Sequence, residues 1–361
     1  GKLFKLPRQD DTLIWALASA ALTSRCFCMG LGIAVAVGLG YLLYRASQRK
    51  GSEKATGAAE TPSERANTNA PLVYENCVVH RITSDEGLKY KVIVSLPHSY
   101  HHAEAAKIQY PVVFALDAEP YLFPLLTTVA RTEHFFKRTT WYPDLIVVGI
   151  TADLEQDFRS PTGGIDVRQL WDALRPTRAR DYLPTQAESP WGAPGASSLK
   201  DVSGYATTFC RFLSSKLVPY VDDHFRTGAS REYRALIGKS FGGSGVAHAM
   251  LDQKCSDCFK YFLLGSPSLA WDNRAFFRLE QESYTSRNPL NAMVYASCGG
   301  KEQGQIQNLQ DFKQLLDSRA YPDLSITTEI VEGEDHGSLS YPFACRSMAW
   351  LRDRLEALRD V

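Results

Sequence analysis

Residues 233–251 read YRALIGKSFGGSGVAHAML, and this stretch decides the fold. A short β-rich run, Tyr233–Ile237, leads into Gly238-Lys239-Ser240-Phe241-Gly242, and a helical pattern follows over Gly242–Leu251. This is a G-x-S-x-G sequence in the strand–turn–helix context that a nucleophilic serine requires. The glycines permit a sharp turn that exposes Ser240, and the helix directs its N-terminal amides toward developing negative charge. A glycine- and serine-rich helix start without catalysis is the alternative.

A serine hydroxyl is a weak nucleophile until a base takes its proton. His336 is the predicted base, because it lies in Glu332-Gly333-Glu334-Asp335-His336-Gly337, just after the last predicted strand. The seven other histidines lie in or beside the first strands, in a polar turn or on predicted helices: His80, His98, His101, His102, His134, His224 and His248. A helical histidine is more often a surface or packed residue than a base.

The third catalytic member should be a carboxylate that orients the imidazole and stabilises its charged form. Glu302 follows the predicted strand Ala292–Ser297 through Cys298-Gly299-Gly300-Lys301. The order Ser240, Glu302, His336 is the one expected of an α/β-hydrolase. Two rival acids, Asp317 and Asp323, and a solvent-facing Glu302 remain alternatives.

An oxyanion hole needs two backbone N–H donors. One is expected from Phe241, the residue after the serine. The second is expected from Ala118 or Glu119, in the turn after the predicted strand Tyr110–Leu116. Pro120 lacks an N–H, and a plain strand–helix connection is the alternative for this turn.

Short β-rich runs alternate with helical patterns over residues 72–361, which predicts one α/β domain with a mostly parallel sheet and helices on both faces. The first two strands follow each other without a helix, so they should pair antiparallel. The predicted strands are Val73–Ile82, Tyr90–Leu96, Tyr110–Leu116, Leu145–Ile150, Tyr233–Ile237, Tyr261–Leu264, Ala292–Ser297 and Ser325–Val331. The predicted helices are Tyr121–Lys137, Tyr205–Phe225, Gly242–Leu251, Asn273–Glu282, Gln305–Ser318 and Tyr341–Leu358.

With these motifs in order, the chain resembles the putative-esterase branch of the α/β-hydrolases, which includes siderophore (enterochelin-type) esterases and S-formylglutathione hydrolase. The resemblance covers most of residues 75–355. It rests on residues 114–118 (FALDA), 180–185 (RDYLPT), 218–221 (VPYV), 238–243 (GKSFGG), 266–273 (SPSLAWDN) and 334–337 (EDHG). It implies Ser240 as nucleophile, Glu302 as acid and His336 as base, with the second oxyanion amide at Ala118 or Glu119.

Four further residues of or beside these motifs are expected to line the substrate pocket: Asp117, Lys239, Tyr182 and Trp271. Residues 152–204 form a long connection, and connections of this length are often functional. We expect this segment to act as a cap over the Ser240 pocket.

Residues 26–44 (CFCMGLGIAVAVGLGYLLY) contain no charge, and about 20 apolar residues suffice to cross a bilayer. They predict a single membrane-spanning helix. A cleaved signal peptide is the main alternative, but its apolar core is normally shorter. Basic residues flank the run on both sides, so the side of the membrane and the organelle stay open, a mitochondrial membrane included.

Residues 46–71 lack large apolar side chains, so this segment predicts a flexible tether. Within the predicted span, Gly30, Ala34 and Gly38 recur at every fourth position. Such small faces let another helix approach closely, so membrane-protein partners are expected beside the lipid bilayer itself. The alternative is that these residues are present only because glycine and alanine are common in membrane helices.

Lys and Arg total 40 and Asp and Glu total 40, so the net charge is zero, which argues against a nucleic-acid binder. Cys255-x-x-Cys258 has no second ligand pair, so a disulfide or two free thiols are better explanations than zinc. No metal or organic cofactor is therefore expected. The sequence predicts a membrane-anchored serine esterase that acts through an acyl-enzyme on an ester substrate. An accessory or structural subunit of a membrane complex, with little or no turnover, is the alternative.

Overall fold

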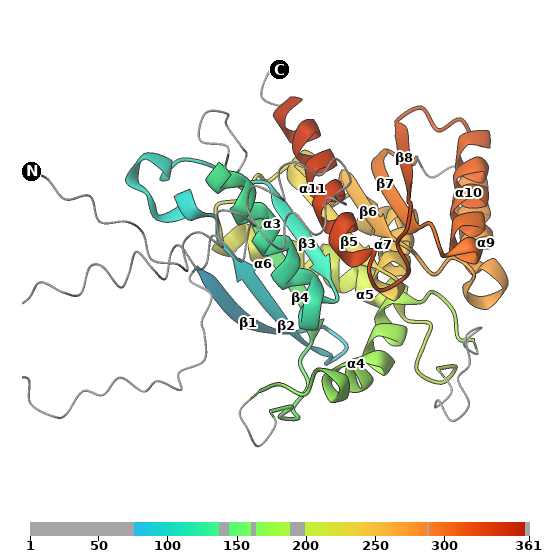
Figure 1. The fold of residues 1–361 in the computed structure, drawn as a ribbon, viewed down its shortest axis with the longest axis horizontal. Coiled ribbons are helices and arrows are strands. Elements are labelled where there is room, and N and C mark those ends of the chain that lie inside the picture. Colours follow the sequence, from blue (N-terminus) through green and yellow to red (C-terminus); the bar gives the residue numbers. More distant parts are fainter. Residues whose placement is uncertain (1–75, 137–143, 160–163, 188–198, 287–288, 358–361) are drawn as a thin grey trace, which may run out of the picture. The chain divides into compact units, whose positions relative to one another are not determined.

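The computed structural model describes residues 76–136, 144–159, 164–187, 199–286 and 289–357 (Figure 1). Leu72–Val361 forms one compact unit. The predicted membrane segment 26–44 and the predicted tether 46–71 lie outside the described residues. Within these ranges, no helix is both long enough and apolar enough to cross a bilayer.

The unit is built on an eight-stranded sheet with the order β1-β2-β4-β3-β5-β6-β7-β8. Its strands are β1 (Cys77–Thr83), β2 (Lys89–Ser95), β3 (Val112–Leu116), β4 (Ile146–Ala152), β5 (Arg234–Lys239), β6 (Tyr261–Gly265), β7 (Ala292–Gly299) and β8 (Leu324–Val331). The β2 strand pairs antiparallel with β1 and β4, and all other pairs are parallel. All eight predicted strands and the antiparallel start are confirmed, with ends that differ by a few residues.

The central strands are buried along their whole length, as parallel strands covered on both faces must be. Every residue of β3 (VVFAL) and of β5 (RALIGK) is buried. The edge strand β1 instead exposes Val78 and Val79. The turns after β3 and β5 therefore leave the sheet at the carboxyl ends of fully buried strands.

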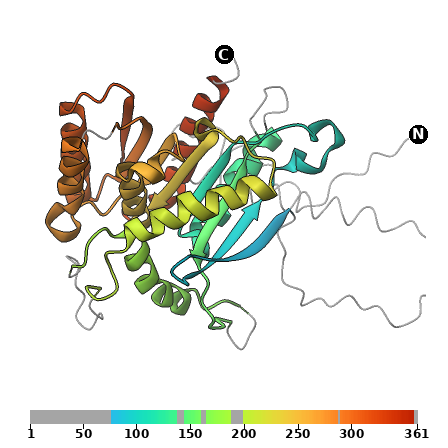
Figure 2. The same ribbon diagram turned by 180° about the vertical axis from the view of Figure 1, so that it is seen from behind.

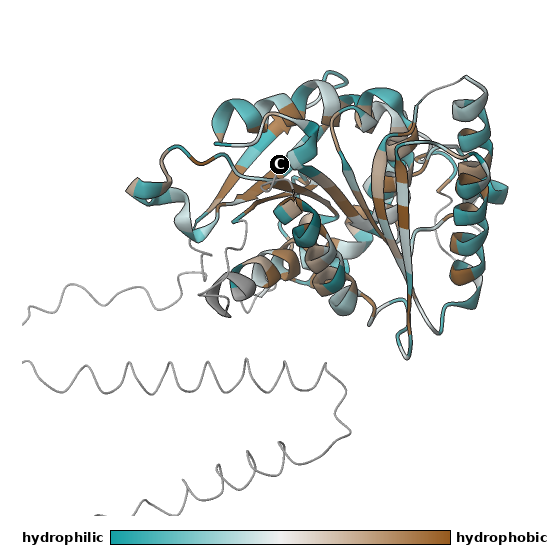
Figure 3. Ribbon diagram, turned by 90° about the horizontal axis from the view of Figure 1, so that it is seen from above, coloured by the Kyte–Doolittle hydropathy of each residue, from teal (hydrophilic) through white to brown (hydrophobic). Residues whose placement is uncertain are grey.

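Helices cover both faces of this sheet. α3 (Phe123–Phe136) and α11 (Ser340–Ala357) pack on one face, over a core that contains Leu122, Leu126 and Phe343. The other face carries α5 (Ala206–Phe212), α6 (Val218–His224), α7 (Phe241–Leu251), α9 (Trp271–Thr285) and α10 (Gln303–Ser318). Figure 2 shows α5 and α6, joined through Leu213–Leu217, running as one rod across this face. In Figure 3 the strands are mainly hydrophobic and the outer helix surfaces mainly hydrophilic.

The predicted connection 152–204 contains a helix that the sequence pattern did not reveal. α4 (Val167–Tyr182) begins after Asp166, whose carboxylate accepts hydrogen bonds from the N–H groups of Arg168 and Gln169. This is an ordinary N-cap. α4 packs against α7, so this helix forms part of the domain core.

Candidate active site

Ser240 lies at the sharp turn between β5 and α7. Its φ is 58° and its ψ is −123°, a backbone conformation that non-glycine residues rarely adopt. The Ser240 N–H donates to the Gly265 carbonyl at 2.8 Å, and its own carbonyl accepts from the Ser244 N–H at 2.9 Å. The turn is therefore held from both sides while its side chain is left at the rim of a cavity.

Two positions of the G-x-S-x-G sequence require glycine, because other atoms lie too close to leave room for a side chain. A Cβ at Gly238 would lie 2.4 Å from the Gly242 carbonyl oxygen. A Cβ at Gly242 would lie 2.8 Å from Oδ2 of Asp117. The second approach also shows that the end of β3 abuts the first turn of α7, which is the arrangement that a two-amide oxyanion hole needs.

Glu302 and His336 are in direct contact. Nδ1 of His336 lies 2.6 Å from Oε1 of Glu302, a distance at which imidazole Nδ1–H donates to carboxylate. Glu302 is 9% exposed, whereas His336 is 48% exposed. Burial alone would raise the pKa of Glu302, but hydrogen bonds from His336, Ser266 and the Gly299 N–H outweigh it and lower this pKa. Glu302 is thus held as a carboxylate beside an accessible imidazole.

Backbone bonds between two loops bring this pair together. The N–H of Gly300, after β7, donates to the Val331 carbonyl at 2.9 Å, and the N–H of Lys301 donates to the Glu334 carbonyl at 3.0 Å. The Asp335 carboxylate accepts from the N–H groups of Gly337 and Ser338, which shapes the turn that carries His336. Parallel pairing of β7 and β8 places both loops at one edge of the sheet.

Ser266 is a site residue that sequence reasoning did not assign. Its hydroxyl donates to Oε1 of Glu302 at 2.7 Å and lies 3.3 Å from Nδ1 of His336. Its φ is 40°, in the left-handed region, at the end of β6. A serine at the carboxyl end of a strand next to the nucleophile strand was the available signal, because those strand ends meet at the same edge.

Ser240, Glu302 and His336 line one cavity of about 660 Å³. α4 supplies Trp171, Asp172, Arg175 and Arg178 to its wall, and the start of α10 supplies Gln303, Gly304, Gln305 and Asn308. Phe241, the predicted oxyanion donor after the nucleophile, lines the same cavity. The described residues show no direct hydrogen bond between Ser240 and His336, and such bonds often tighten only when substrate binds.

Asp117, at the end of β3, is a buried structural anchor of the predicted oxyanion turn. Its φ is 54°, so the chain turns sharply before Ala118 and Glu119. Its carboxylate accepts two hydrogen bonds from Arg178, at 2.6 Å and 2.7 Å. Ala118 is fully buried, and the Glu119 carboxylate pairs with Lys91 at 2.5 Å. Neither residue's side chain lines the cavity, so only their backbone amides remain candidates for the hole.

The cavity lining does not include the four residues expected there, which are instead buried. Asp117 holds Arg178, Tyr182 accepts the Asp117 N–H at 3.2 Å, and Trp271 donates to the Thr185 carbonyl at 3.2 Å. All are less than 5% exposed, Lys239 included. These four residues therefore contact other buried groups and do not line the cavity. The sequence alone cannot distinguish a residue that lines a cavity from a buried residue that packs against the lining.

The Asp117–Arg178 pair provides a stability prediction. The two side chains are 1% and 7% exposed, so Asp117→Asn would leave a guanidinium buried without its counter-charge. Removing one partner of a buried ion pair costs about 3–5 kcal/mol, and we expect a loss of that order in the free energy of unfolding. Urea denaturation measures it. Glu155→Gln, which breaks an exposed pair with Lys89, should leave the free energy of unfolding almost unchanged.

Lys239 precedes the nucleophile and is buried, and its ammonium group has no hydrogen-bond or ion-pair partner among the described residues. Burial lowers its pKa to about 8 from an ordinary value of 10.5. The folded chain therefore binds this proton less well than the unfolded chain. The resulting destabilisation is fully present below pH 8 and disappears as the pH rises toward 10.5.

Lys239→Met keeps the length of the side chain and removes its charge. We expect it to raise the free energy of unfolding by about 2–3 kcal/mol at neutral pH, and most of that gain should vanish between pH 8 and pH 10.5. Urea unfolding of both proteins across this range checks the slope. A gain that is independent of pH would show that packing, and not charge burial, is responsible.

The sequence of this chain is similar to those of known esterases. Residues 181–337 match the family model described as "Putative esterase". A siderophore enterobactin esterase from Emericella nidulans is 23% identical over 254 residues, which are 69% of this chain and 77% of that protein. The segment 181–337, which matches the family model, contains Ser240, Glu302 and His336.

Two solved structures share the fold. The BES protein from Bacillus cereus superposes with a TM-score of 0.63 at 19% identity, covering 78% of this chain and 98% of that chain. Siderophore hydrolase EstB from Aspergillus nidulans gives a TM-score of 0.62 at 20% identity, covering 79% of this chain and 98% of that chain. At such identities the likeness establishes the shared architecture.

Proposed function

Since the chain is an esterase-like hydrolase related to the siderophore esterases, we propose that Ser240, His336 and Glu302 form its catalytic triad. The observation that supports this proposal is that all three residues line one cavity, in which Glu302 and His336 are in hydrogen-bond contact. Three residues distant in sequence have the chemical types and the order that acyl transfer needs.

The proposed reaction is hydrolysis of a carboxylic ester through an acyl-enzyme. His336 takes the Ser240 proton as the hydroxyl attacks the carbonyl carbon, and it then gives that proton to the leaving alcohol. Glu302 holds the imidazole by its Nδ1–H and stabilises the imidazolium. The amides of Phe241 and of Ala118 or Glu119 stabilise the oxyanion. Water then releases the acid by the same steps, so no cofactor is required.

A siderophore ester is the proposed substrate class. The relatives' names supply this class, and the size of the cavity agrees with it, since ligand sites are typically about 300–1,000 Å³. Trp171 offers an aromatic wall, and Arg175 and Asp172 add charges of opposite sign to the same side, where the charge of Arg178 is already balanced by Asp117.

Labelling with a fluorophosphonate probe tests the proposal. The purified full chain should be labelled, and mass spectrometry should locate the adduct on the peptide that contains Ser240. Enterobactin and p-nitrophenyl butyrate, added in excess, should slow labelling if they occupy the cavity. An unlabelled, folded protein that also leaves both esters intact would exclude the esterase proposal and favour the accessory-subunit alternative.

Membrane anchoring through residues 26–44 is a separate part of the proposal. The uncharged length of this run supports a single span, and its small-residue faces support contact with other membrane proteins. Carbonate extraction of native membranes tests the anchor. Retention of the full chain in the pellet, and its release after removal of residues 1–71, are the expected results.

A further inference from the structure

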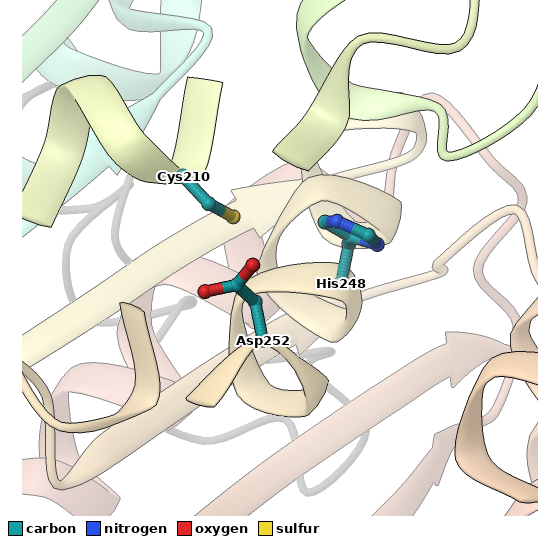
Figure 4. Close-up of side chains that lie close together, drawn as sticks. All are labelled: Cys210, His248 and Asp252. Carbon is teal, nitrogen blue, oxygen red and sulfur yellow. The ribbon is translucent and has the colours of Figure 1, made fainter. Parts of the chain in front are cut away.

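A second cluster of chemically reactive side chains lies where α5 packs on α7 and on α8 (Gln253–Ser256). Cys210 comes from α5, His248 from α7 and Asp252 from the junction of α7 and α8. One ligand atom from each lies within 4.8 Å of the other two. Figure 4 shows the three side chains turned toward one another. None of them lines the Ser240 cavity.

His248 is 6% exposed, and its hydrogen bonding is incomplete. Its Nε2 lies 3.0 Å from the Thr207 hydroxyl, whereas its Nδ1 is buried and has no hydrogen-bond partner. A buried polar atom without a partner is uncommon and costly. With the proton on Nε2 and donated to Thr207, the Nδ1 lone pair is free to bind a metal. An oxygen acceptor on the far nitrogen is the usual support of a metal-bound histidine.

Asp252 supplies negative charge to the cluster. One of its oxygens accepts the Cys255 N–H at 3.0 Å, and the other has no hydrogen bond to a described residue. In that part of the chain Asp252 also has no ion-pair partner. Its carboxylate is partly exposed, which gives an ion a route from solvent to the buried thiol and imidazole.

We propose that Cys210, His248 and Asp252 bind one divalent transition-metal ion of the zinc class. Thiolate, imidazole and carboxylate are the ligand types that zinc prefers. Binding displaces the Cys210 thiol proton to solvent and forms a metal–sulfur bond. Ligand atoms around zinc lie about 3.3–3.8 Å apart, so the cluster must contract by about 1 Å. A water fills the fourth position.

The site would be structural. It would fasten α5 to the end of α7, the helix that begins at the nucleophile turn, and so stabilise the layer behind the active site. Neither cysteine of the Cys255-x-x-Cys258 sequence is a member of this ligand set. The set combines residues from two helices that are far apart in sequence.

Cobalt substitution tests the site in the full chain. Protein treated with chelator and then titrated with Co²⁺ should show a sulfur-to-cobalt charge-transfer band that saturates at one ion per chain. Zn²⁺ should abolish this band by displacing Co²⁺, and it should also raise the Tm. Cys210→Ser should remove the band, and Cys258→Ser, the matched thiol outside the cluster, should retain it.

Two milder variants keep the test decisive if Cys210→Ser does not fold. Thr207→Val removes the support of His248 and should weaken Zn²⁺ binding by about 10–100-fold. Asp252→Asn keeps the shape of the carboxylate and should weaken binding at least as much. A band that is absent from the wild type, that persists in Cys210→Ser, or that has unchanged affinity in both milder variants would overturn the proposal. These outcomes are independent of whether Ser240 is reactive.

Discussion

Ser240→Ala is expected to abolish fluorophosphonate labelling and to lower kcat for ester hydrolysis by at least about 10⁴-fold. The reason is that no acyl-enzyme can form without the hydroxyl. Loss of the nucleophile alone removes nearly the whole contribution of a triad. The measurement is initial-rate hydrolysis of p-nitrophenyl butyrate under saturating substrate, together with gel detection of the probe.

The variant should remain folded, which makes the result interpretable. Within the described residues the Ser240 turn is held by backbone bonds to Gly265 and Ser244, and alanine keeps both. Ser215→Ala is the matched control, because that serine is exposed and its hydroxyl bonds only to the Arg211 carbonyl of its own helix. Labelling that survives in Ser240→Ala but disappears in another serine variant would reassign the nucleophile.

Glu302→Gln is expected to lower kcat by about 10³–10⁴-fold while leaving the cavity shape almost unchanged. The carboxylate accepts from Nδ1 of His336 at 2.6 Å, from the Ser266 hydroxyl at 2.7 Å and from the Gly299 N–H at 2.9 Å. A neutral amide cannot stabilise the imidazolium, and its NH₂ group would meet donors. Steady-state kinetics at several pH values separates this loss of kcat from a change in KM.

Ser266→Ala is the matched control for this prediction. It removes one hydrogen bond to the same carboxylate but keeps the charge, so we expect only about a tenfold loss of kcat. A similar loss in both variants would mean that Glu302 acts through position alone. Full activity of Glu302→Gln would transfer the role of the acid to another carboxylate, such as the rival Asp317 or Asp323.

Glu302→Gln should also change how the free energy of unfolding depends on pH in acid. Because hydrogen bonds lower the pKa of Glu302 in the folded chain, its carboxylate contributes stability above its unfolded pKa, near 4.5. That contribution is lost as the pH falls through the lower folded value. Glu302→Gln should therefore flatten the acid side of the stability profile. Urea unfolding from neutral pH down to about pH 3 checks this, and an unchanged slope would contradict it.

Hydrophobic runs and glycine turns were sufficient to predict the strands of the sheet and to select candidate reactive residues at the strand ends. β3 and β5 are short apolar runs bounded by turn residues, so they had to be buried parallel strands. The helix α4 was missed because its internal Pro176, its many charges and its neighbouring glycines resemble a loop. Its N-cap Asp166 and its buried Leu170 and Leu174, four residues apart, were the signal that could have identified it.

By itself, the sequence determined which residue types stand at the ends of the strands. The reason is that the order of the strands along the chain and the conformation of each turn depend on residues that are close together in sequence. Ser240, Glu302 and His336 could be selected for that reason. Only the tertiary structure decided which side chains meet: that Ser266 supports Glu302, that Asp117 holds Arg178, and that Cys210 and His248 share one cluster. Such contacts depend on helix packing and on strand register, which arise when distant segments exclude water together.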